Sequence, residues 1–220
     1  MLEVAGMSLR IASMRDATHL LDEPDCAKRF LDADMAPYGV ELWPAAIMLA
    51  EYMTCHDTGP HSALEIGCGL GLVSIVAARM AWSVVAGDHE PTALVFARHN
   101  AQLNGVSDIR FMELDWTVPP NASRFTRILG ADILYQLNNH GPILSCLDRL
   151  LDDGGIALIS DPNRGVADRF PEAAHAAGFH LEVVPATAEG LSRRPVEGRI
   201  FRLYRASKRA DTALPLGKPG

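Results

Sequence analysis

The sequence lacks several features that mark particular classes of protein. Its cysteines form no C-x-x-C pair, and the spacing of Cys55, His61 and Cys68 fits no common zinc pattern. We therefore expect no metal, and scattered cysteines favour the cytoplasm. The longest nearly apolar window, residues 69–87, contains Arg79 and glycines, which indicates a helix and a buried strand. We expect no membrane partner and no signal segment.

Positive charge is also scarce. Lysine occurs only at positions 28, 208 and 218, and the formal net charge is -7. Nucleic-acid-binding surfaces need clustered positive charge, so we expect no nucleic-acid partner. The chain has 220 residues, 48% of them hydrophobic, which is enough for one α/β domain with a core of its own.

The most informative stretch of the chain is residues 63–75. A short apolar run contains Glu65 and is followed by glycines at alternate positions: Gly67, Gly69 and Gly71. An amphipathic stretch begins at Leu72. We interpret this as a strand, a glycine-rich loop and a helix, because glycine permits positive φ and lets a ligand approach the main chain. The loop would deliver that ligand to the N–H groups at the start of the helix.

Strand-like and helix-like segments alternate along the rest of the chain. Strands are predicted at 63–66, 82–87, 109–114, 128–135, 156–160, 180–184 and 200–204, and helices at 44–53, 72–81, 91–103, 140–151 and 166–177. This order predicts an α/β fold with a single, doubly wound, mostly parallel seven-stranded sheet. We expect an N-terminal extension or lid over residues 1–36, one domain over 37–205 and a disordered tail over 206–220. Five arginines are expected on the solvated face of the last hairpin: Arg193, Arg194, Arg199, Arg202 and Arg205.

A carboxylate follows the second predicted strand. Asp88 lies 23 positions after Glu65, about where an α/β nucleotide-binding unit places the acid that accepts from ribose hydroxyls. Asp88 could instead only cap the next helix, which has Pro91 at its start. If the register differs, Glu90 takes the ribose role.

Polar residues also follow the third and fourth predicted strands. Asp115 could accept from an adenine amino group and Trp116 could stack on the base, or they could be a turn residue and a core residue. Asp132 lies within an apolar run, and an unpaired buried carboxylate is costly. It must therefore lie near a strand end, a cation or hydrogen-bond donors. Strand ends form the ligand crevice of such sheets, so we expect Asp132 beside a sulfonium or an amine.

These motifs together resemble the class I, seven-β-strand methyltransferases that use S-adenosylmethionine (AdoMet), and within them the family-16 protein lysine methyltransferases. The similarity is carried by residues 42–46, by Glu65 to Gly71 and by Asp115-Trp116. The most specific part is residues 130–135, which fit the D/E-x-x-Y motif of that group. The resemblance implies a Rossmann-like methyltransferase fold, AdoMet as the donor and S-adenosylhomocysteine as the product.

The resemblance also implies roles for individual residues. Gly67, Gly69 and Gly71 would hold the methionine part of AdoMet, and Glu65 would support the loop. Asp88 would lie at the ribose, Asp115 and Trp116 would lie at the adenine, and Trp43 would close the pocket. The cofactor would also contact Cys68, His89 and Asp132, and Asp132 and Tyr135 would be catalytic and line the amine channel. Residues 161–164 resemble a D-P-G-R loop of the group, with Asn163 in place of glycine.

Three functions follow from these patterns. The first is N-methylation of a protein amine, with a lysine of a protein substrate as acceptor, Asp132 orienting the amine and Tyr135 forming a wall and a hydrogen bond. The second is methylation of a small amine, as in nicotinamide methyltransferases, with residues 1–36 as a lid. The third is a non-catalytic partner protein of the same fold.

Overall fold

A computed structural model describes residues 1–13, 38–189 and 194–205 of the chain. At the N-terminus, β1 (Leu2–Val4) and β2 (Met7–Leu9) form a two-stranded antiparallel hairpin. Residues 14–36 of the predicted N-terminal extension and the predicted tail over 206–220 lie outside the described residues. No helix in the described part of the chain is long and apolar enough to cross a membrane.

Seven strands form the main sheet in the order β5-β4-β3-β6-β7-β9-β8. Their bounds are β3 Ser62–Ile66, β4 Ser83–Asp88, β5 Arg110–Glu113, β6 Phe125–Ala131, β7 Leu151–Asp161, β8 Phe179–Glu189 and β9 Pro195–Arg205. The pairings from β5 through β7 are parallel, and β9 is antiparallel to both of its neighbours. The predicted mostly parallel, seven-stranded α/β sheet is confirmed.

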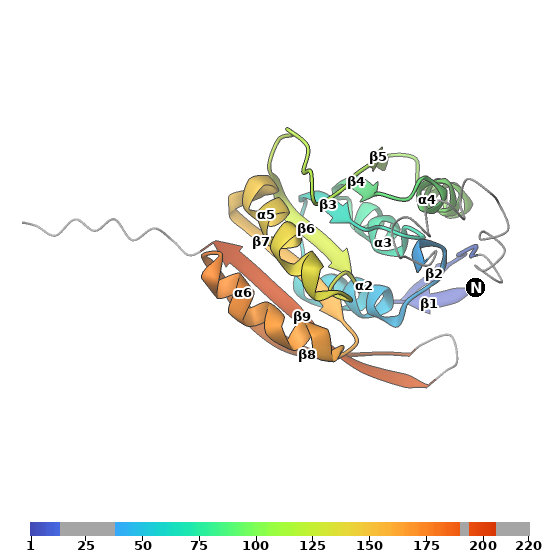
Figure 1. Ribbon diagram of the computed structural model, residues 1–220. Coiled ribbons are helices and arrows are strands. Elements are labelled where there is room, and N and C mark those ends of the chain that lie inside the picture. The colour runs from blue at the N-terminus through green and yellow to red at the C-terminus, as the bar shows by residue number, and fades with distance from the viewer. Residues whose placement is uncertain (14–37, 190–193, 206–220) are drawn as a thin grey trace, which may run out of the picture.

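Helices cover both faces of this sheet (Figure 1). The helices α2 (Pro44–His56), α3 (Leu72–Arg79) and α4 (Pro91–Leu103) pack on one face, and α5 (His140–Leu150) and α6 (Phe170–Ala176) pack on the other. Short 3-10 helices lie at Tyr38–Val40 (η2), Leu137–Asn139 (η3) and Gly165–Arg169 (η4). This sandwich of three layers is the doubly wound arrangement that alternating strands and helices predict.

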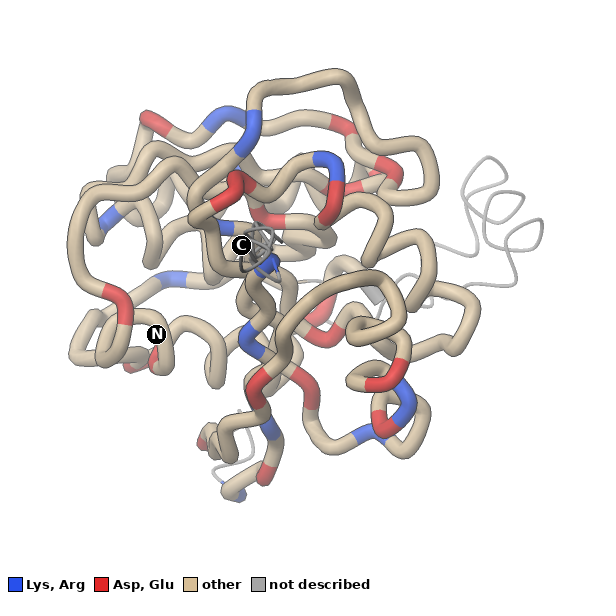
Figure 2. The backbone as a smooth tube through the Cα atoms, turned by 90° about the vertical axis from the view of Figure 1, so that its left-hand side faces the viewer, with Lys and Arg blue, Asp and Glu red and all other residues tan. Residues whose placement is uncertain are grey.

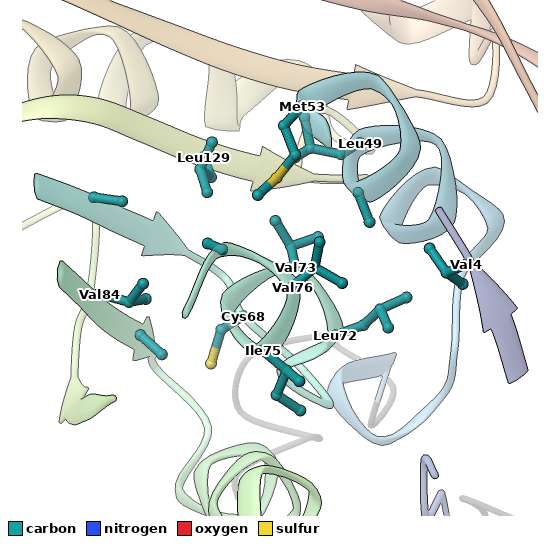
Figure 3. Close-up of a cluster of buried hydrophobic side chains, with 14 of the residues drawn as sticks. Val4, Leu49, Met53, Cys68, Leu72, Val73, Ile75, Val76, Val84 and Leu129 are labelled. Carbon is teal, nitrogen blue, oxygen red and sulfur yellow. The ribbon is translucent and has the colours of Figure 1, made fainter. Parts of the chain in front are cut away.

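The core consists of two apolar clusters, one on each face of the sheet. Successive residues of a strand point to opposite faces, so Ala63 belongs to the cluster under α2 and α3, whereas Leu64 belongs to the cluster under α5. Figure 3 shows the first cluster, with the side chains of α3 between the sheet and α2. The two clusters fix the sheet between its helices and therefore fix the positions of the strand ends.

Two of the predicted elements differ from the observed ones near the candidate site. The strand predicted to run to residue 135 ends at Ala131, because Asp132 takes a positive φ of 58° and turns the chain away from the sheet. The helix predicted at 166–177 is divided into η4 and α6. As a result, residues 132–135 and 162–164 are loops at the edge of the sheet.

Candidate functional site

The candidate site lies where the parallel strands end. The strands β3, β4, β5, β6 and β7 share one direction, so the segments that follow them all emerge at one edge of the sheet (Figure 1). From β3 the chain proceeds outward through β4 and β5 and then returns to β6 on the other side of β3. This reversal creates the crevice in which open α/β sheets bind ligands.

The glycine loop between β3 and α3 has a conformation that requires glycine. Gly67, Gly69 and Gly71 have φ values of 69°, 50° and 79°, in the left-handed region that L side chains rarely adopt. A Cβ atom on Gly67 would lie 3.2 Å from the ring of Trp116 and 3.1 Å from Ile133. The loop therefore presents bare main chain beside an aromatic wall.

The buried carboxyl group of Glu65 connects the end of β3 with the first turn of α3. The Ser74 N–H donates to Glu65 Oε2 at 2.9 Å, and the Ser74 hydroxyl donates to the same oxygen. Burial raises the pKa of Glu65 to about 8, although the two hydrogen bonds from Ser74 act in the opposite direction. These contacts hold the two ends of the glycine loop together.

Asp88, at the end of β4, also holds the loop in place. The Gly69 N–H donates to Asp88 Oδ2 at 2.8 Å, and the Glu90 N–H donates to Oδ1 at 2.9 Å. His89 Nδ1 lies 3.5 Å from Oδ1. The carboxyl group is buried, which raises its pKa. Both oxygens thus serve the main chain, and Glu90 lies beside them as the N-terminal cap of α4. The ribose role of Asp88 and the cofactor role of His89 stay predictions.

The residues after β5 take different positions. Asp115 is exposed, and its Oδ1 accepts from the Thr117 N–H at 2.8 Å and the Thr117 hydroxyl at 2.7 Å. These hydrogen bonds are those of a turn residue, which was the alternative to an adenine contact. Trp116 is only 9% exposed and packs over Gly67. Its ring centroid lies 6.2 Å from that of His89. Trp116 is therefore both a core residue and a wall of the site, and the adenine contacts of both residues stay predictions.

Asp132 follows β6 and pairs with Arg164 in the loop after β7. Arg164 Nε donates to Asp132 Oδ1 at 2.6 Å, and an Arg164 terminal nitrogen donates to Oδ2 at 2.8 Å. The Arg164 guanidinium also lies over the ring of Trp43, 5.7 Å from its centroid. Trp43 immediately precedes α2. The buried carboxylate thus has both a strand end and a cation beside it, as the cost of burying it requires.

A second ion-pair network lies next to this pair. Arg199, on β9, donates to Asp161 Oδ1 at 3.1 Å, to Asp168 at 2.7 Å and to the Arg164 carbonyl at 3.0 Å. Its side chain is only 17% exposed, so the expectation that it lies on the solvated face of the last hairpin is wrong. Figure 2 shows the acidic and basic residues interspersed along the chain. Arg202 and Arg205 do make exposed ion pairs, with Glu182 and Asp148.

Two of the predicted site residues remain. Tyr135 is half-buried in the bend that follows β6, close in sequence to Asp132. The side chain of Cys68 lies in the apolar cluster under α3 (Figure 3), where burial raises the pKa of its thiol. Cys68 can thus contribute only its main chain to a ligand. Among the described residues, no three His, Cys, Asp or Glu side chains form a group that could hold a metal ion.

Sequence reasoning missed two polar residues that shape the site, Ser74 and Asn100, and it placed Arg164 in the 161–164 loop without its pairing to Asp132. Asn100 is fully buried on α4, where its amide donates to the Leu70 carbonyl of the glycine loop at 3.0 Å. Ser74 and Asn100 each interrupt the apolar face of a predicted helix. An interrupted face is the one sequence signal that could have found them, because buried polar groups need partners.

Solved structures of similar shape include methyltransferases. A TehB-like AdoMet-dependent methyltransferase from Corynebacterium glutamicum is 18% identical, with a TM-score of 0.59, over 87% of this chain and 100% of that one. A ribosomal protein L11 methylase from Lactobacillus delbrueckii subsp. bulgaricus is 22% identical, with a TM-score of 0.56, over 71% of this chain and 76% of that one. At these identities the similarity shows the fold, which is that of the class I methyltransferases.

Relatives with similar sequences include protein methyltransferases. The ribosomal protein L11 methyltransferase of Pseudomonas aeruginosa is 30% identical over 82% of this chain and 59% of its own length, so this chain spans about six tenths of that relative. The mouse protein-lysine methyltransferase METTL21E is 30% identical over 55% of each chain. The mouse histone-arginine methyltransferase METTL23 is 30% identical over 49% of this chain and 46% of its own. A family model described as lysine methyltransferase matches residues 29–170, and the chain belongs to that family.

Proposed function

We propose that the protein is an AdoMet-dependent methyltransferase that methylates a lysine side chain of a protein. The observation that carries the proposal is the bare glycine loop, tied by Glu65 and Asp88 at the reversal point of the sheet. The family membership and the protein-methylating relatives support it. The proposal includes a cytoplasmic location and no requirement for a metal, a membrane or a nucleic acid.

The residues around the glycine loop suit a donor such as AdoMet. AdoMet, when bound, supplies a methyl group activated by a sulfonium. The main chain of Gly67 to Gly71 would contact its methionine part, because the positive φ values of Gly67, Gly69 and Gly71 favour glycine and glycine leaves the main chain uncovered. Asp88 or Glu90, which lie together at the end of β4, would accept hydrogen bonds from the ribose hydroxyls. Trp116, which packs over Gly67, would form a wall for the adenine side.

Asp132 and Tyr135 would lie on the acceptor side. A lysine amine, with an ordinary pKa of about 10.4, must lose its proton before it can attack the methyl carbon. Transfer is then an in-line displacement, in which an enzyme contributes mainly alignment and electrostatics. The lone-pair positions of the Asp132 carboxylate that Arg164 leaves available could orient the amine.

The test combines binding with labelling. Calorimetry of the full chain with AdoMet should show saturable binding, and incubation with radiolabelled AdoMet and a cell lysate should label a protein band. Mass spectrometry of the labelled protein should place the methyl group on lysine rather than arginine. Absence of AdoMet binding would favour the non-catalytic function, and label confined to the small-molecule fraction would favour a small amine.

The Asp132→Ala variant tests the acceptor assignment. It should bind AdoMet with the affinity of the wild type and lose label transfer by about 100-fold or more, since orientation and electrostatics supply much of the rate. Asp153→Ala removes an exposed carboxylate that pairs with Arg124 and serves as the matched control. Transfer by Asp132→Ala at the control rate would contradict the assignment.

A further inference from the structure

Arg164 holds the carboxylate that would orient the acceptor amine. Its guanidinium contacts both oxygens of Asp132, at 2.6 and 2.8 Å. We propose, on the basis of the proposed function, that Arg164 is a second residue of the acceptor site: it shares Asp132 with the incoming lysine, and its charge keeps the amine in the neutral, nucleophilic form. An arginine is unexpected in a channel for lysine, because the two side chains carry like charges. The assignment gives Arg164 a role there.

The position of Arg164 is fixed from several sides. Its main-chain N–H donates to Asp161 Oδ1 at 3.0 Å, and its carbonyl accepts from Arg199 at 3.0 Å. Its side chain is held by Asp132 and by the ring of Trp43, 5.7 Å away. These contacts come from the segment after β6, from β7 and β9, and from the residue before α2. A cation fixed in this way acts electrostatically without rearranging during the reaction.

The charges around the acceptor position are nearly balanced. Asp132, which follows β6, is paired with Arg164, while Asp161 on β7 and Asp168 on η4 are both paired with Arg199 on β9. Without Arg164, the Asp132 carboxylate would face the lysine unpaired. An unpaired carboxylate stabilises the ammonium form of lysine and raises its pKa. A cation beside that carboxylate has the opposite effect and favours loss of the proton before the reaction.

This arrangement accounts for the proton and the electron pairs. The lysine releases its proton to solvent as it enters, and the nitrogen lone pair then forms the new N–C bond. The S–C bond breaks, and its electron pair stays on sulfur to give the neutral thioether product. Asp132 retains lone pairs for the amine, because each carboxylate oxygen can accept more than one hydrogen bond. No separate general base is needed in the site.

The test is the pH dependence of label transfer from radiolabelled AdoMet to the proteins of a cell lysate. Arg164→Gln should move the acid limb of the profile upward by about one pH unit, so that transfer falls by about tenfold below the limb and converges with wild type at alkaline pH. Arg164→Lys keeps the charge and should keep the wild-type limb. Arg202→Gln is the matched control, because its side chain is 35% exposed against 36% for Arg164 and also pairs with an acid.

Each other outcome has a defined meaning. Equal loss of transfer by Arg164→Gln at every pH, or an acid limb that does not move, would overturn this inference. In that case, protein labelling by the wild type would still support the proposed function. No labelled protein with wild type would overturn both. Circular dichroism and AdoMet calorimetry report whether Arg164→Gln is folded. If it is not, Arg164→Lys decides the matter, because an acid limb shifted from that of wild type would contradict a role based on charge.

Discussion

Asp132 and Asn163, two non-glycine residues at the candidate site, have left-handed backbone conformations. Their φ values are 58° and 60°, in a region where asparagine and aspartate are the best tolerated of the residues with a side chain. Asp132 turns its carboxylate out of the sheet, and Asn163 turns the loop that carries Arg164. This conformation explains why the D-P-G-R loop, which residues 161–164 resemble, has glycine at the place of Asn163. Strained residues of this kind gather at functional sites, and here they bring Asp132 and Arg164 together.

Glu65 gives a prediction about the pH dependence of stability. Its pKa is about 8 in the fold, against an ordinary value of 4.5, so between these pH values the folded protein retains a proton that the unfolded chain has released. The free energy of unfolding therefore falls as pH rises through this window. Glu65→Gln does not titrate but can still accept from Ser74. We expect its free energy of unfolding, relative to wild type, to rise from about pH 5 to about pH 8.

Urea unfolding at several pH values measures this difference. Glu113→Gln, at an exposed position of β5, is the control and should remain parallel to wild type. A difference between Glu65→Gln and wild type that does not change with pH would show that Glu65 is ionised in the fold.

At the scale of elements, helix α4 connects the N-terminal segment with the glycine loop. The buried Asn100 amide donates to the Ala12 carbonyl and to the Leu70 carbonyl, both at 3.0 Å, and its oxygen accepts from the Ala12 N–H at 2.7 Å. Asn104, one turn further on, makes the corresponding exchange with the main chain of Arg10 at the surface. One side chain of α4 thus holds both the segment after the hairpin and the loop that we assign to AdoMet.

Asn100→Ala should therefore weaken both stability and donor binding. It leaves buried main-chain groups without partners, which costs about 1–3 kcal/mol, and it releases Leu70 within the glycine loop. We expect a lower unfolding midpoint in urea and a several-fold weaker AdoMet affinity by calorimetry. Asn104→Ala removes exposed hydrogen bonds to the neighbouring residue Arg10 and should keep the wild-type affinity. Equal AdoMet affinities for the two variants would contradict a coupling through Asn100.

At the scale of the whole molecule, periodicity and glycine spacing were sufficient to predict the sheet and the order of its elements. The alternation of Ala63 and Leu64 between two cores is what a strand buried on both faces requires. Pairings between side chains were not predictable, because Asp132 and Arg164 are 32 positions apart and meet only through the parallel register of β6 and β7. The pairing of Arg199 with Asp161 was not predictable either, because the antiparallel pairing of β7 and β9 brings these distant residues together.

The net charge of the whole chain bears on the kind of acceptor. A chain with a formal net charge of -7 attracts a lysine-containing, basic protein segment at long range, and salt screens this attraction over a Debye length of about 10 Å at 0.1 M. We expect kcat/KM for labelled lysate protein to fall several-fold between about 50 and about 500 mM salt, with kcat nearly constant, because steering acts on encounter rather than on transfer. AdoMet affinity measured over the same salt range separates this effect from donor binding. A salt-independent kcat/KM would contradict the long-range attraction of the acceptor protein by the net charge of this chain, since salt screens such an attraction.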